Sequence, residues 1–164
     1  MKEFSIPLIS DYTRPVIELY KLPALIDTDA VIPIVSMYPA LFEKCFDAKI
    51  ILQDKYIIGT YGEEKGAVYS ISNFKIGDLT FENFEVFVPY EPNIKFPFLL
   101  SATLFYGLIY EIDTINQKFT VRMKEEQPLT REFKIKDLDG QLYPQIDGVL
   151  FQDIDIELQD FQVI

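Results

Sequence analysis

Histidine and tryptophan are absent from this 164-residue chain, and Cys45 is its only cysteine. Without histidine the chain cannot form a Ser-His-Asp or Cys-His nucleophilic arrangement, nor a zinc or haem site with histidine ligands. A single cysteine excludes an intrachain disulfide and a cage of thiolate ligands around a metal. Acid–base chemistry would therefore depend on carboxylates, with tyrosine or lysine as lesser candidates. We expect no metal and no cofactor.

Basic residues are also scarce, because 15 lysines and arginines stand against 26 aspartates and glutamates, for a net charge of −11. A chain this acidic offers no basic surface that would bind nucleic-acid phosphates or an anionic membrane. It has no apolar run close to the roughly 20 residues that span a bilayer. Residues 1–5 lack the charged-then-apolar pattern of a secretory leader. We therefore expect a cytoplasmic protein that binds neither nucleic acid nor membranes.

Short runs of Ile, Val, Phe, Tyr and Thr, broken by turn residues, predict a mainly β fold. The clearest predicted strands are residues 49–58, 67–74, 79–88, 108–112 and 118–123. Gly59, Gly62 and Gly66 cluster between the first two of these strands, which is typical of a hairpin tip that needs positive φ angles. The length fits one domain with a substantial core.

Two short helices are predicted, at residues 39–46 and 98–105, and Ser36 is a candidate cap upstream of the first. Cys45 lies within the apolar pattern of the first helix, together with Leu41. We therefore expect Cys45 to pack in the core rather than to act as a reactive thiol.

The segment Ala24-Leu25-Ile26-Asp27-Thr28-Asp29-Ala30 is the sharpest local feature of the sequence. An apolar strand that runs into Asp-Thr places a carboxylate at a strand end within an apolar setting. From these residues alone, Asp27 is either a catalytic group or an ordinary cap of a turn. Three segments follow it in order: the glycine-bearing hairpin 57–62, the strand-turn-strand 68–84, and the apolar run 98–104 leading into 110–114.

This order resembles the retropepsin-like aspartic peptidases. Chains of that family carry apolar-Asp-Thr/Ser-Gly-Ala, a glycine-bearing flap, a strand pair reading roughly Gly-x-x-Phe-x-Asn, and a short helix before a strand ending in Ile-Asp. The resemblance covers about residues 17–123. It implies a closed β-barrel of the acid-protease fold, with one or two short helices. On this basis residues 1–123 form the peptidase domain, and 124–164 form a C-terminal β extension packed on it.

The resemblance also implies an endopeptidase that is active as a homodimer, because each chain supplies one catalytic aspartate at Asp27. Two such carboxylates at close range share a proton and activate a water for attack on a peptide carbonyl. Thr28 matches the residue whose hydroxyl joins the two active-site loops across the two-fold axis.

A further set of residues matches the substrate-binding part of the family pattern. Thr60, Tyr61 and Gly62 correspond to the tip of the flap, which closes over an extended peptide and excludes water. Asp29 and Ala30 follow the catalytic residue and would lie beside the substrate. The implied partners are a second copy of the chain and a peptide or protein substrate.

Asp29 and Ser101 depart from the family pattern, which usually has glycine at both positions. Asp29 would place four carboxylates near one dimer axis, and such crowding raises the pKa values of some of them. An alternative is therefore a catalytically inactive member of the same fold that serves as a peptide-binding or assembly domain. A third interpretation is an unrelated β domain that binds a small ligand or a cation.

The remaining acidic segments are interpreted as structural. Asp113 is expected in a hairpin, and residues 137–140 are expected to form a turn. Residues 153–158 alternate acidic and apolar side chains, which predicts a strand with a solvated acidic face. A calcium site at either of the last two segments is the less favoured alternative.

Overall fold

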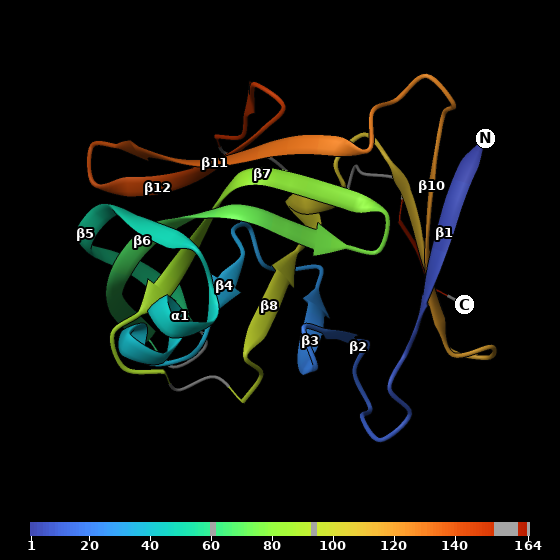
Figure 1. Cartoon of the computed structure of the whole chain (residues 1–164), viewed down its shortest axis with the longest axis horizontal. Helices are drawn as coiled ribbons and strands as arrows, with labels where there is room; N and C mark the ends of the chain where they lie inside the picture. The colour runs from blue at the N-terminus through green and yellow to red at the C-terminus, as the bar shows by residue number, and fades with distance from the viewer. Residues whose placement is uncertain (60–61, 93–94, 153–160, 164) are drawn as a thin grey trace.

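The computed structural model describes residues 1–59, 62–92, 95–152 and 161–163 (Figure 1). The helix α1 spans Pro39–Cys45, and the short 3-10 helix η1 spans Ala102–Phe105. Strands β1 to β14 span, in order, Lys2–Pro7, Val16–Leu19, Leu22–Asp27, Ile34–Val35, Ala48–Gly59, Gly62–Ile76, Leu79–Pro89, Phe98–Ser101, Ile109–Asp113, Lys118–Met123, Thr130–Leu138, Gln141–Ile146, Val149–Leu150 and Phe161–Val163. The prediction of a mainly β fold is confirmed.

The strands form two sheets. One has the order β1-β10-β9-β14, and in it β9 and β10 form the predicted hairpin. The other has the order β13-β12-β11-β7-β4-β8-β3-β2, with β6 also paired to β7 and β5 paired to β6. In Figure 1, β11 and β12 lie across β5, β6 and β7, while β1 and β10 stand at the opposite end of the molecule. No helix among the described residues has the length and apolar character needed to cross a membrane.

Phenylalanine rings fill the core between these strands. Phe74 of β6 stacks on Phe84 of β7 at a centroid distance of 4.8 Å, and both rings are fully buried. Phe133 of β11 packs edge-on against Phe84 at 5.9 Å. Because apolar burial is the main stabilising contribution to a fold, β11 shares one core with the strands that precede it.

The hairpin of β5 and β6 extends beyond the sheet. Pairing between β6 and β7 ends at Gly66 opposite Pro89. A Cβ at Gly66 would lie 2.4 Å from the carbonyl oxygen of Val88, so only glycine allows the two strands to approach this closely. On β5 the pairing register shifts before Lys55, where Asp54 has a φ of +55° and donates its N–H to the Tyr90 hydroxyl at 3.0 Å. Past these points the two strands form a ribbon with which no third strand pairs in the part of the chain that the structure describes.

The second predicted helix is half wrong, because residues 98–101 form strand β8 and only 102–105 turn helically. β8 is buried along its length and pairs with β3 on one side and β4 on the other. Its partners lie far away in sequence, and a short apolar run has the same pattern in a buried strand as in a helix.

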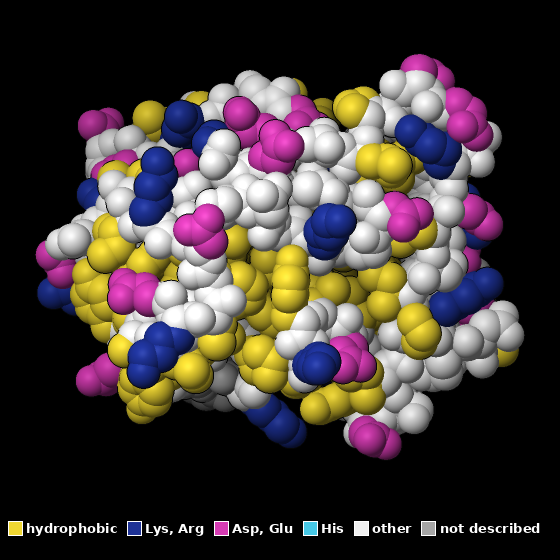
Figure 2. All heavy atoms as spheres, viewed as in Figure 1, with side chains coloured by type: hydrophobic (Ala, Val, Ile, Leu, Met, Phe, Trp, Pro, Cys, Tyr) yellow, Lys and Arg dark blue, Asp and Glu magenta, His cyan; other side chains and the backbone are white. Residues whose placement is uncertain are grey.

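The first helix is confirmed, but two details of its prediction are wrong. Cys45 is exposed, because α1 has only seven residues and buries Phe42 alone. Leu41 is also exposed, and Figure 2 shows hydrophobic side chains gathered over α1 and β8. The N-cap position is Tyr38, which makes no capping hydrogen bond through its side chain, so Ser36 is not the cap.

Beyond residue 123, strands β11, β12 and β13 continue the larger sheet, and β14 joins the smaller sheet beside β9. β11 runs parallel to β7 and forms a hairpin with β12. The predicted turn between them is confirmed, since the Gly140 N–H donates to the Asp137 carboxylate at 2.9 Å. The strand predicted at 153–158 lies outside the described residues, and the division of the chain at residue 123 stays a prediction.

Candidate active site

Asp27 is the last residue of β3, and the three residues before it are almost completely buried. β3 runs parallel to β8, with Asp27 opposite Ser101. The side chain of Asp27 is half-buried where the strand ends. Two apolar parallel strands therefore hold one carboxylate at their common end. The sequence predicted the strand that ends in Asp27 but not its pairing with β8.

The loop after β3 is closed by Asp27 itself. Its Oδ1 accepts a hydrogen bond from the Asp29 N–H at 3.1 Å, and its backbone carbonyl accepts one from the Ala30 N–H at 3.1 Å. This is an Asx-type turn, for which aspartate is well suited. Asp29 is exposed and is not among the described residues with a positive φ. The backbone at this position therefore accommodates a side chain, although the family pattern has glycine there.

Two buried hydroxyls anchor the same loop to η1. Thr103 donates its hydroxyl hydrogen to the carbonyl oxygen of Val31 at 2.8 Å. The Ser101 hydroxyl lies 2.8 Å from the Thr103 hydroxyl. A hydroxyl has one hydrogen, so Ser101 is the donor of this second bond. Ser101 and Thr103 have no exposed surface. The serine that replaces a family glycine thus supports the loop that carries Asp27.

Arg131 of β11 in turn holds η1. Its side chain is 8% exposed and donates to the carbonyl oxygens of Leu104, at 2.9 Å, and Tyr106. It also donates to the Asp147 carboxylate at 3.0 Å. Burial lowers the pKa of Arg131, and the negative charge of Asp147 opposes this effect. Carbonyls at the end of a helix lack intrahelical hydrogen-bond donors, and here the buried guanidinium of Arg131 donates the missing hydrogen bonds.

The ribbon of β5 and β6 has two different faces. Residues directly opposite each other in an antiparallel pair point to the same side. Ile57 pairs with Glu64, and both side chains are turned inward, with Glu64 only 8% exposed. Ile58 pairs with Glu63 and points outward, with Ile58 89% exposed. Thr60 and Tyr61, predicted at the flap tip, lie outside the described residues.

A cleft of about 1010 Å³ lies between the ribbon and the Asp27 loop. Its walls include Asp27, Asp29 and Ala30 from the loop, residues 56–58, 63 and 64 of the ribbon, residues 95, 96 and 99 near β8, and residues 140–142 of the β11–β12 hairpin. Three of the seven predicted site residues, Asp27, Asp29 and Ala30, therefore lie together in the walls of this cleft. Gly62 has the expected positive φ, +104°, but is not among the described residues that line this cleft.

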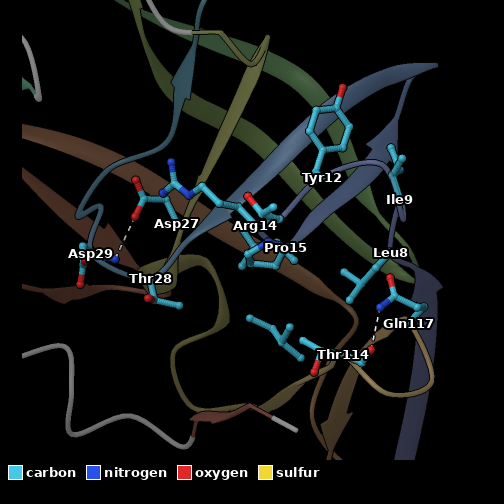
Figure 3. Close-up of a pocket in the computed structure, with 13 residues that line it drawn as sticks. Leu8, Ile9, Tyr12, Arg14, Pro15, Asp27, Thr28, Asp29, Thr114 and Gln117 are labelled. Carbon is cyan, nitrogen blue, oxygen red and sulfur yellow. Dashed lines mark hydrogen bonds between the residues drawn. The ribbon is translucent and has the colours of Figure 1, made fainter.

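A second cavity, of about 450 Å³, adjoins the same loop and shares Arg14, Asp27 and Asp29 with the cleft (Figure 3). Thr28 lines this cavity and not the larger cleft, while Asp27 and Asp29 line both. Arg14 also lines both, and Figure 3 shows its side chain extended toward Asp27.

The larger cleft is acidic. Asp27, Asp29, Glu63 and Glu64 contribute to its walls, against Arg14 and Lys95. Among the described residues, no three Asp, Glu or Cys side chains group closely enough to hold a metal ion.

Sequence analysis missed Glu64 and the β11–β12 contribution to the cleft. The two consecutive glutamates read as solvated hairpin residues, and only the register Ile57–Glu64 shows which one points inward. Asp113, in contrast, lies where predicted. Its carboxylate accepts hydrogen bonds from Asn116 and Ile115, which lower its pKa and close the β9–β10 turn.

The sequence matches no protein-family model and no curated protein. Among solved structures, the fold matches a retropepsin-like aspartic protease from Rickettsia conorii with a TM-score of 0.50 and 19% sequence identity. The match covers 73% of this chain and 89% of that chain. The chain has a retropepsin-like fold. At this identity the likeness concerns the fold, while the sequence Asp27-Thr28-Asp29 is a property of this chain.

Proposed function

We propose that the chain is an aspartic endopeptidase that works as a homodimer, with Asp27 of each copy activating a water beneath the β5–β6 ribbon. One observation carries the proposal: in a retropepsin-like fold, a carboxylate at a buried strand end and an overhanging hairpin line the same 1010 Å³ cleft. A cleft of this size accommodates several residues of an extended peptide, whose main chain can pair with exposed strand edges.

The chemistry requires two carboxylates, and one chain supplies one at this position, so the second comes from a second copy. Two aspartates at close range cannot both ionise easily and therefore share one proton. The ionised carboxylate takes a proton from the water as its oxygen attacks the peptide carbonyl, and the protonated carboxyl donates its proton to the carbonyl oxygen. The carbon–nitrogen bond then breaks, and the departing amine receives a proton.

The hydrogen bond from the Asp29 N–H to Asp27 Oδ1 fixes the orientation of the catalytic carboxyl before substrate binds. A preoriented group needs less reorganisation in the transition state. Asp29 also favours the rival function, an inactive peptide-binding or assembly domain, because its charge adds a second carboxylate close to Asp27 in each copy.

The experiment is digestion of a diverse peptide library, read by mass spectrometry, at several pH values from about 3 to 7, the range in which a proton-sharing pair operates. Wild type, Asp27→Asn and Asp78→Asn are compared after each has been shown to be folded and dimeric. Asp78 is an exposed aspartate of the β6–β7 turn and lines neither cavity. We expect wild type and Asp78→Asn to cleave the same peptides and Asp27→Asn to cleave none.

Equal cleavage by wild type and Asp27→Asn would assign the activity to a contaminant or to another site. No cleavage by a folded, dimeric wild type would favour the peptide-binding alternative. In that case Asp29→Gly provides a direct check, because recovery of cleavage would identify the extra carboxylate as the inhibitory group.

A further inference from the structure

Glu64 is a buried carboxylate for which no described residue supplies a hydrogen bond. It is 8% exposed, its Oε2 atom has no partner, and it forms no ion pair within the described part of the chain. An unpaired buried carboxylate is costly, and native structures rarely retain one without a functional reason. The side chain is one of those that line the cleft on its ribbon side, while its Oε2 atom is buried beneath that wall.

The nearby cations are directed elsewhere. Lys55 shares the inner face of the ribbon, because it pairs with Gly66 across the strands, but its ammonium group binds Asp137 of β11. Lys65 belongs to the outer face and pairs with the exposed Asp54 at 3.6 Å. Lys95 lines the cleft but is exposed and does not reach Glu64. The Glu64 carboxylate is therefore available to a cationic group of a bound ligand.

The surroundings of Glu64 suit a long basic side chain. Ile57 lies directly across the ribbon from it, and Leu142 and Gln141 of β12 line the same cleft. Lysine and arginine pack their aliphatic stems along apolar surface while the charged end reaches a polar group. The Lys55–Asp137 ion pair fastens the ribbon to β11, so the β11–β12 hairpin forms a wall of this part of the cleft.

We propose that Glu64 is the recognition group of a subsite for a lysine or arginine side chain of an extended peptide. The proposal deepens the proposed function, since it takes the cleft as the peptide-binding site. A charge-assisted hydrogen bond in a buried setting contributes more than one at the surface. One basic residue at a fixed position of the peptide therefore determines much of the binding preference, and the β11–β12 hairpin helps to shape the pocket that receives it.

The test measures binding and cleavage separately. A set of fluorescent decapeptides carries a single lysine at each position in turn, and each peptide has a matched control with norleucine, which keeps the stem and removes the charge. Binding is measured by anisotropy on Asp27→Asn, which holds a peptide without cutting it, and on the same protein with Glu64→Gln or Glu82→Gln. Glu82 is the matched control, because it is an exposed glutamate of β7 that lines neither cavity.

At one peptide position we expect lysine to bind about tenfold more tightly than norleucine. Glu64→Gln should abolish this ratio, and Glu82→Gln should keep it. The proposal is overturned if lysine and norleucine bind equally well at every position, or if the preference for lysine survives Glu64→Gln.

Parallel digestion by the wild type separates the subsite from the activity. A lysine preference in binding without cleavage keeps the subsite and removes the peptidase function. Cleavage without a lysine preference in binding keeps the peptidase function and removes the subsite. If no peptide binds, both fall.

Discussion

Replacing Arg131 with methionine tests whether the β11 segment supports the Asp27 loop. Methionine fills most of the same space, so the main loss is polar. The carbonyls of Leu104 and Tyr106 lose their donor, and each buried unsatisfied group costs about 1–3 kcal/mol. Asp147 is 44% exposed and returns to water at little cost. We therefore expect Arg131→Met to lower the free energy of unfolding by about 3 kcal/mol, a large part of the ~5–15 kcal/mol typical of a domain.

The assay is urea unfolding followed by far-ultraviolet circular dichroism, since the chain has no tryptophan. Protein concentration is held constant because association changes apparent stability. Asp147→Asn keeps both hydrogen bonds to the carbonyls and should cost less. Lys65→Met removes an exposed ion pair with Asp54 and an exposed cation–π contact with Tyr56, and should change little. A loss below about 1 kcal/mol for Arg131→Met would refute the reasoning, as would equal losses for Arg131→Met and Lys65→Met.

Two further substitutions test features that hold the ribbon. Hydrogen bonds from Lys55 and the Gly140 N–H lower the pKa of Asp137, so its stabilisation is present above the unfolded-state pKa and disappears as pH falls through the lowered folded value. Asp137→Asn should therefore lower the melting temperature at pH 7 but not near about pH 2. The exposed Asp139→Asn is the control. A loss of melting temperature that persists in acid, or one equal to the loss caused by Asp139→Asn, would contradict this expectation. Gly66→Ala should destabilise the fold by about 1–3 kcal/mol because its Cβ would meet the Val88 carbonyl at 2.4 Å; an unchanged urea midpoint would show that the strands can separate at no cost.

Features encoded by neighbouring residues were predictable from the sequence. Strands β5, β6, β7, β9 and β10 alternate or run apolar between turn residues, and α1 begins at a proline that suits a first helical turn. Asp27 was found because an apolar run ends in Asp-Thr, and the order of the following segments indicated the retropepsin-like fold. The strands, α1 and Asp27 are each signalled by residues within or next to the element, whereas the fold was indicated by the order of segments along about residues 17–123.

Features that depend on distant contacts were not predictable in the same way. β8 is a strand because β3 and β4 flank it, and those partners lie far away in sequence. Cys45 looked buried because it shares an apolar pattern with Phe42, but a seven-residue helix has one buried position. The inward direction of Glu64 follows from the register of the ribbon, which is shifted by irregular pairing before Lys55. One residue of difference in register would have exchanged the faces of Glu63 and Glu64.

The β5–β6 ribbon over the cleft is held to the rest of the molecule at one end. Its fixed end lies where β6 leaves β7 at Gly66 and where Tyr90 holds the backbone of Asp54, and Lys55 is clamped there to β11. A two-stranded overhang bends most easily next to its support, so the work of uncovering the cleft is concentrated at these clamps and not along the surface that would face a peptide. Under the proposed function, the Lys55–Asp137 pair would therefore influence both the opening of the cleft and the shape of the proposed subsite, whereas the Gly66 and Tyr90 contacts would affect opening alone.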